Sequence, residues 1–323
     1  MKKKLRLVIT AVLFIPLAGF TQQKDTLINK LDSLNRKTDS AGKQINNIKP
    51  AAYNELTKIS FKNYFVLLAS DLKQEFTKPF HMTHKDWGNF GKFGVAIAAV
   101  GFADEPAQKY SVKLMRNKPT LRNISGYITK FGGAYETYTL ASFAAYGLIF
   151  KNPKMITTTM LATQAYLTGA ALEGTIKFIS GRTRPTYYAA NVEAEPRFLG
   201  PFSKIGRDSK GKRRFSSFPS GHTTVAFAAA TVFAKEYGDK AYVPFIAYSA
   251  ATLIGLSRIT ENKHWATDVL TGAVIGYMAG KNIVNNYHRY AKLKASQQNK
   301  NTVSFSLQYF NKQFVPGLIY KFK

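Results

Sequence analysis

The chain has 323 residues, of which 45% are hydrophobic, and a net charge of +28 from 46 lysines and arginines against 18 acidic residues. This length allows one large domain with a sizeable core, and the charge favours anionic partners: phosphorylated substrates, acidic membrane surfaces or nucleic acid. Because the chain contains no cysteine, disulfides and thiolate metal sites are excluded.

The N-terminus has the pattern of a secretory signal peptide. Three lysines and Arg6 precede an apolar segment, Leu7 to Phe20, of suitable length. We assign residues 1–21 as a signal peptide, which predicts export to the periplasm or cell envelope. A retained anchor helix is the alternative, although the apolar segment is short for a membrane span. Residues 22–57 carry leucines and isoleucines at roughly helical spacing, which predicts an N-terminal amphipathic helix.

Six apolar segments with helical periodicity lie in residues 58–292, which we expect to form the core. They are Phe93–Ala103, Gly132–Phe150, Met155–Ile179, His222–Tyr237, Ala241–Leu256 and Trp265–Ile283. The sequence therefore predicts an all-α fold. Residues 293–323 form a linker and tail, in which Val303–Phe310 and Phe314–Phe322, the second broken by Pro316-Gly317, predict a small β-hairpin.

The first segment that points to chemistry is KFISGRTRP, residues 177–185. On a continuous helix Lys177 and Arg184 would lie two turns apart on one face, although Pro185 disfavours helix at Arg184. Together with Arg182 they form a basic cluster that can bind an anion. Taken alone, the segment is also typical of a solvated helix end.

The second segment is PSGH, residues 219–222, where the fourth apolar segment begins. A helix N-terminus has unpaired N–H groups and a partial positive charge, which suit an anion. Ser220 can cap the helix and donate its hydroxyl, Gly221 lets the backbone approach an oxyanion, and His222 can deliver a proton. An ordinary serine cap with an incidental histidine is the alternative.

The third segment is SRITENKHWATD, residues 257–268. His264 and Asp268 are one helical turn apart, so their side chains can meet. A carboxylate that accepts from one ring nitrogen fixes the tautomer and leaves the other nitrogen able to attack. Arg258 is a forked donor suited to phosphate oxygens. A purely structural His–Asp pair is the alternative.

Together and in this order, the three segments resemble the signature of the type 2 phosphatidic acid phosphatase family, within the acid phosphatase/vanadium haloperoxidase superfamily. The resemblance covers roughly residues 90–285. It implies a six-helix bundle in which His264 is the nucleophile that forms a phosphohistidine, Asp268 orients it, and His222 protonates the leaving alkoxide. It further implies that no metal or other cofactor is needed, and that the phosphoryl oxygens are held by Lys177, Arg184, Ser220, Gly221 and Arg258.

We therefore expect a metal-independent phosphatase at the cell envelope that acts on lipid phosphates or lipid pyrophosphates, at a membrane surface and without nucleic acid. A broad-specificity periplasmic acid phosphatase and a vanadium-dependent haloperoxidase are alternatives, because they share these residues. A non-catalytic anion binder would not need two histidines and an aspartate. Because acidic or polar residues interrupt several apolar segments, we expect a domain that touches lipid. An integral membrane protein is the main alternative.

Other basic and histidine-containing segments are less specific. His81 and His84, with Asp86 nearby, form either a metal pair or a polar segment before a helix. His288 is expected at an exposed basic helix end. A long loop before Pro219 contains the basic run SKGKRRF, which can attract anionic surfaces.

Overall fold

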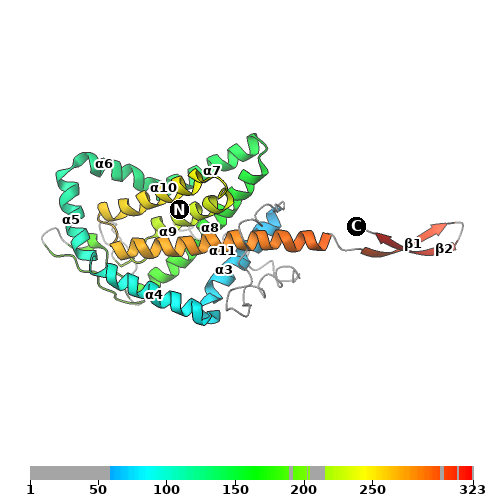
Figure 1. The fold of residues 1–323 in the computed structure, drawn as a ribbon, viewed down its shortest axis with the longest axis horizontal. Helices are drawn as coiled ribbons and strands as arrows, with labels where there is room; N and C mark the ends of the chain where they lie inside the picture. The colour runs from blue at the N-terminus through cyan, green and yellow to red at the C-terminus, as the bar shows by residue number, and fades with distance from the viewer. Residues whose placement is uncertain are drawn as a thin grey trace, which may run out of the picture.

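The computed structural model describes residues 59–321 except 189–191, 202, 204–214, 299–301 and 311–312. Within these residues the chain forms nine α-helices, three short 3-10 helices and one two-stranded sheet (Figure 1). The elements are α3 (Phe61–Thr77), η2 (Lys78–His81), α4 (His84–Gly101), α5 (Asp104–Asn117), α6 (Pro119–Ile128), η3 (Thr129–Gly132), α7 (Ala134–Ile149), α8 (Pro153–Ser180), η4 (Pro185–Tyr187), α9 (Gly221–Glu236), α10 (Tyr242–Thr260), α11 (Ala266–Gln298), β1 (Thr302–Phe310) and β2 (Gln313–Lys321). The predicted signal peptide and N-terminal helix lie outside the described residues, as does the run of charges at 210–214.

The prediction of an all-α core is confirmed, but the part of the chain that the structure describes has more α-helices than the six expected. Helices α3, α5 and α6 lie in stretches for which we predicted no helix. Helix α4 also begins earlier than expected, because Thr83 and Asp86 form a capping box in which each side chain accepts from the other's backbone N–H. Asp86 therefore caps a helix.

Two antiparallel strands follow α11, in register from Thr302 opposite Lys321 to Phe310 opposite Gln313. Strand β2 continues through Pro316 and Gly317, where the sequence indicated a break. In a two-stranded sheet both strands are edges, and a proline is tolerated there because it can face away from the ladder.

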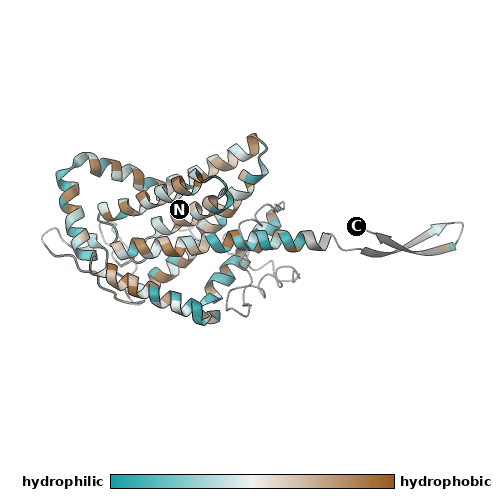
Figure 2. Ribbon diagram, viewed as in Figure 1, coloured by the Kyte–Doolittle hydropathy of each residue, from teal (hydrophilic) through white to brown (hydrophobic). Residues whose placement is uncertain are grey.

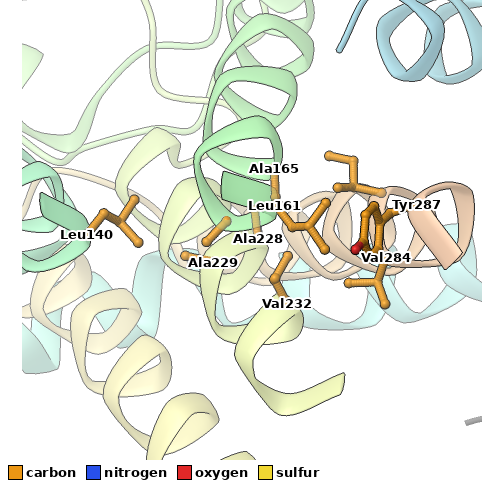
Figure 3. Packing of buried hydrophobic residues seen from close by; sticks show 10 residues of the cluster. Leu140, Leu161, Ala165, Ala228, Ala229, Val232, Val284 and Tyr287 are labelled. Atoms are coloured by element: carbon orange, nitrogen blue, oxygen red, sulfur yellow. The ribbon is translucent and has the colours of Figure 1, made fainter. Parts of the chain in front are cut away.

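Helix α9 lies at the centre of the bundle and packs against α8, α10 and α11. Its alanine-rich sequence is buried on most sides, as expected for a helix that is apolar all round. The main hydrophobic cluster joins α7, α8, α9 and α11 (Figure 3). Its labelled members are Leu140, Leu161, Ala165, Ala228, Ala229, Val232, Val284 and Tyr287.

Helix α11 touches the backbone of α9 through glycines spaced four residues apart: Gly272, Gly276 and Gly280. A Cβ added at each of them would lie 2.6, 2.2 and 2.5 Å, respectively, from the carbonyl oxygens of Ser220, Thr224 and Ala228. Small residues at this spacing form one stripe on a helix and allow two helix backbones to approach closely. The stripe thereby holds the N-terminus of α9 next to that of α11.

Helix α11 is largely buried from Ile283 to Ala291, contrary to the expectation of an exposed end at His288. That side chain is 1% exposed, and its Nε2 lies 2.7 Å from Oε1 of Glu236 on α9. Two residues earlier in the sequence, the Asn286 amide donates to Asp71 and Gln74 of α3. The expectation was wrong because α11 continues past Ile283 and packs against both neighbours.

Several helices expose large apolar side chains. Phe102 is 87% exposed, Phe245 of α10 74% and Ile149 of α7 73%. Figure 2 shows hydrophobic residues along much of α7 and α10, and hydrophilic residues on α5. Among the described residues, only α10 is long and apolar enough to cross a membrane, and 28% of that stretch is buried against the rest of the protein.

We expect Gly276→Ala to destabilise the fold, because the added methyl group would overlap the Thr224 carbonyl oxygen. Such overpacking costs typically about 1–3 kcal/mol of unfolding free energy. The control is Gly174→Ala in α8, where an added Cβ meets no atom within 4 Å; this variant should gain up to ~1 kcal/mol from helix propensity. Chemical unfolding in detergent measures both, and equal stability of the two variants would rule out the close contact.

Candidate active site

The first basic segment leaves its helix before Arg184. Helix α8 ends at Ser180, where Gly181 takes the left-handed conformation with φ 53°. Arg184 is then extended, with φ −81° and ψ 148°, and Pro185 begins η4. Lys177 and Arg184 therefore do not share a helical face, as a continuous helix would require. The chain instead folds back, so that both side chains are buried at the end of α8.

Lys177 lies against the start of α9. Its ammonium group pairs with Glu173 Oε2 at 2.6 Å. A Cβ added at Gly221 would lie 3.0 Å from Lys177 Nζ and 2.7 Å from Glu173 Oε1. The first and second segments therefore meet at Gly221, as binding of one anion by both requires.

Ser220 occupies the N-cap position of α9, but its side chain does not cap the helix. The structure shows no capping bond from this hydroxyl, whose oxygen instead lies 2.8 Å from Thr223 Oγ1 as a hydrogen-bond acceptor. The Ser220 backbone N–H donates to the Asp268 carbonyl at 2.9 Å. This bond joins the second segment to the third.

His222 follows on the first turn of α9 and is partly buried. It lies against η3, because a Cβ added at Gly133 would be 3.2 Å from its Nε2. Its charge also acts on His264, as described below, so the two histidines belong to one site.

His264 is 3% exposed, and the Ser217 carbonyl oxygen is the nearest acceptor for its ring. Nδ1 lies 2.7 Å from this oxygen, but 3.4 Å from Asp268 Oδ2, which is long for a hydrogen bond. A carbonyl can only accept, so Nδ1 carries the proton and Nε2 has a free lone pair. The predicted pairing with Asp268 is present as a weaker, second contact.

The surroundings of His264 keep its ring uncharged. Burial, followed by the positive charges of Arg184, Arg258, Lys177 and His222, holds the pKa of His264 well below its usual range. Because desolvation and nearby cations both disfavour imidazolium, the ring is neutral at neutral pH. The same cations would attract a phosphate group to this nitrogen.

Asp268 is fully buried and organises the loops around His264. Its Oδ2 accepts from the Trp265 backbone N–H at 2.9 Å and from the Ser217 hydroxyl, while Oδ1 accepts from Arg182 Nη1. Burial raises the pKa of Asp268, whereas Arg182, Ser217 and Trp265 lower it. Asp268 thus holds the Ser217 carbonyl that orients the His264 ring.

Arg182 joins Asp268 to a second buried carboxylate. Its Nη2 donates to Asp104 Oδ2 at 2.6 Å, and Thr267 donates to Asp104 through both its backbone N–H and its hydroxyl. The sequence placed Arg182 in the basic cluster but assigned it no role, and it did not indicate Asp104 or Ser217. Arg182 binds two fully buried carboxylates, whereas Lys177 and Arg258 each pair with one carboxylate that is partly exposed.

Arg184 and Arg258 are both held by contacts in or near the His264 loop. Arg184 Nη2 donates to the Ser216 carbonyl at 3.0 Å. Arg258 Nη1 donates to Glu261 at 3.0 Å, and the Arg258 carbonyl accepts from the backbone N–H of His264 at 3.2 Å. A neutral imidazole nitrogen surrounded by fixed cations and a helix N-terminus can attack phosphorus while the donors stabilise the phosphoryl oxygens. Among the described residues, no three His, Asp or Glu side chains are grouped to hold a metal ion.

Comparison with known proteins agrees with the three segments. Residues 154–291 match the sequence model of the PAP2 superfamily, the family that the motifs predicted. Lipid A 1-phosphatase from Porphyromonas gingivalis is 42% identical over 89 residues, covering 26% of this chain and 20% of that protein. Lipid phosphate phosphatase 1 from Arabidopsis thaliana is 29% identical over 159 residues, covering 42% of this chain and 49% of that protein. The chain thus spans half or less of these relatives.

Two solved structures match the chain only weakly in three dimensions, and one is a transmembrane PAP2-type phosphatidylglycerolphosphate phosphatase from Bacillus subtilis. It is 20% identical, with a TM-score of 0.40 over 77% of this chain and 96% of that chain. LpxE from Aquifex aeolicus is 26% identical, with a TM-score of 0.35 over 50% of this chain and 84% of that chain.

We expect Arg182→Ala to destabilise the protein by about 3–5 kcal/mol, because it leaves two buried carboxylates without their counter-ion. Arg197→Ala is the matched control, since that side chain is 64% exposed and pairs with Glu195 at the surface; its loss should change the stability little, because exposed ion pairs contribute little. Denaturant unfolding of both variants measures the difference. An Arg182→Ala protein as stable as Arg197→Ala would show that Arg182 is not the counter-ion of Asp104 and Asp268.

Proposed function

Since residues 154–291 match the sequence model of the PAP2 superfamily, we propose that this protein is a phosphatase that removes phosphate from phosphorylated lipids at the cell envelope. The observation that carries the proposal is His264, a buried neutral imidazole whose Nδ1 is held by a carbonyl and whose surroundings are cationic. Two of the relatives are named for phosphatase activity on lipid A and on lipid phosphates, which supports a lipid substrate.

The reaction proceeds in two halves. His264 Nε2 attacks phosphorus, the P–N bond forms as the P–O bond to the lipid breaks, and His222 gives its proton to the leaving alkoxide. In the second half, His222 takes a proton from water, whose oxygen attacks phosphorus and breaks the P–N bond. Phosphate leaves, and both histidines return to their starting states.

The charges of the transferred phosphoryl group are balanced by fixed donors. Lys177, Arg184 and Arg258 supply positive charge, and the N-terminus of α9 supplies the Ser220 hydroxyl and the Gly221 backbone N–H. When phosphate binds, the Lys177 ammonium group must either leave Glu173 or bind both Glu173 and the phosphate. This donor set provides the charge stabilisation for which other phosphatases use a metal ion, so we propose that the reaction is metal-independent.

Contact with a membrane follows from the exposed apolar side chains. Phe102, Phe245 and Ile149 are each more than 70% exposed, and they belong to different parts of the chain. Exposure on this scale marks a surface that meets lipid or another protein. We propose that residues 1–21 are a signal peptide for export. An N-terminal segment at 22–57, a phosphatase core at 58–292 and a tail at 293–323 follow it.

The test is phosphate release by the full-length protein from phosphatidic acid, phosphatidylglycerol phosphate, undecaprenyl pyrophosphate, lipid A and a soluble aryl phosphate. We expect activity on at least one lipid, unchanged by EDTA, and losses of about 10³-fold or more in His264→Ala and His222→Ala. His84→Ala, a substitution of an exposed histidine outside the site, should keep wild-type activity. Activity only on the aryl phosphate would favour an acid phosphatase, and bromide oxidation with bound vanadate a haloperoxidase; either result overturns the proposal.

A further inference from the structure

An apolar groove of about 470 Å³ lies between α7, α9 and α10. Small side chains from α9 and α10 make up part of its lining. These are Ala226, Ala229, Ala230, Ala247, Ala250 and Ala251. Phe131 and Phe143 also line it, so the groove has the volume and the apolar chemistry to hold a hydrocarbon chain.

The groove begins beside the candidate active site. Ala226 follows His222 by one turn of α9. A Cβ added at Gly132 would lie 3.1 Å from His222 Cβ and 2.4 Å from Ile254 Cγ2, and Ile254 lines the groove. From His222 to Phe233, the α9 residue that lines its other end, the helix rises roughly 16 Å at 1.5 Å per residue.

One acidic side chain lines this apolar groove. Glu136 of α7 is 6% exposed, and neither of its carboxyl oxygens has a hydrogen-bond partner among the described residues. Burial raises the pKa of Glu136 to about 8, so at neutral pH the group is mostly protonated and can donate. Buried polar groups normally have partners, and one without a partner costs stability.

The position of Glu136 sets the distance of this donor from the phosphate site. Gly133, which contacts His222, precedes Glu136 by three residues, and this is slightly less than one helical turn or about 5 Å along α7. The Glu136 backbone therefore lies less than one helical turn from the residue that meets His222, and a lipid has only a few bonds between its phosphate and its acyl carbonyl group.

We propose that the groove holds an acyl chain of the phosphorylated lipid, and that the Glu136 carboxyl group donates a hydrogen bond to the ester or amide carbonyl oxygen at the head of that chain. The inference rests on the proposed phosphatase function and names acylated lipid phosphates as its substrate class. Ether lipids and polyprenyl phosphates have no such carbonyl group, so they would leave the buried Glu136 without a partner.

The first test compares two substrates of equal chain length, dihexadecanoyl phosphatidic acid and its dihexadecyl ether analogue. The wild-type protein should show a kcat/KM about three- to tenfold higher for the ester, as expected from one hydrogen bond. Glu136→Leu should abolish this preference, whereas Glu136→Gln, whose amide still donates, should retain it. Glu136→Leu should also raise Tm at pH 7, because it removes a buried group that ionises more readily in the unfolded chain.

The second test fills the groove. Ala250→Phe adds a ring at an exposed lining position, and Ala145→Phe makes the same change at an exposed position of α7 outside the groove. Ala250→Phe should lower kcat/KM for the long-chain ester at least about tenfold relative to the soluble aryl phosphate, and Ala145→Phe should leave this ratio unchanged.

The aryl phosphate distinguishes failure of the acyl-site proposal from failure of the phosphatase proposal. If the wild-type protein hydrolyses it and the lipids but does not prefer the ester, or if Ala250→Phe behaves like Ala145→Phe, the groove is not the acyl site although the phosphatase proposal stands. If the wild-type protein hydrolyses no phosphate ester, both proposals fall.

Discussion

The close contact between α9 and α11 is the constraint on which the site depends. Gly276 and its two neighbours in the stripe let α11 reach the carbonyl oxygens of α9, so the two helices have one register relative to each other. That register brings the Ser220 N–H to the Asp268 carbonyl at 2.9 Å. The histidines on the two segments therefore converge because two backbones touch, and a bulkier residue in the stripe would separate them.

Several positively charged side chains lie around His264, and they differ in the groups that they bind. Arg182 is neutralised by Asp104 and Asp268, so it connects α5, the end of α8 and the start of α11. Arg184 donates instead to the backbone carbonyl oxygens of Ser216 and Lys263. Arg182 thereby holds the loops in place, whereas Arg184 is the first of the cations that lower the pKa of His264.

Much of this site could be predicted from the sequence because its motifs are local. Short segments of sequence were enough to identify two features of the site. One is the spacing of His264 and Asp268, one helical turn apart, and the other is the group of basic residues before Pro185. The role of Arg182 was not, because Asp104 lies 78 residues before it and nothing in the local pattern joins them. The burial of His288 was missed for the same reason, since Glu236 is distant in the sequence. Helical periodicity correctly marked six helices but not α5, whose side chains are mostly polar.

The central claim is that His264 attacks phosphorus, and trapping the intermediate tests it most directly. Wild-type enzyme is mixed with radiolabelled lipid phosphate, quenched in alkali during turnover and digested with trypsin. The sequence places His264 in the peptide 264–281 and His222 in the peptide 215–235, so the two histidines can be told apart. The account predicts an alkali-stable, acid-labile label on His264 alone. A label on His222 or on a serine, or turnover with no labelled peptide, would contradict it.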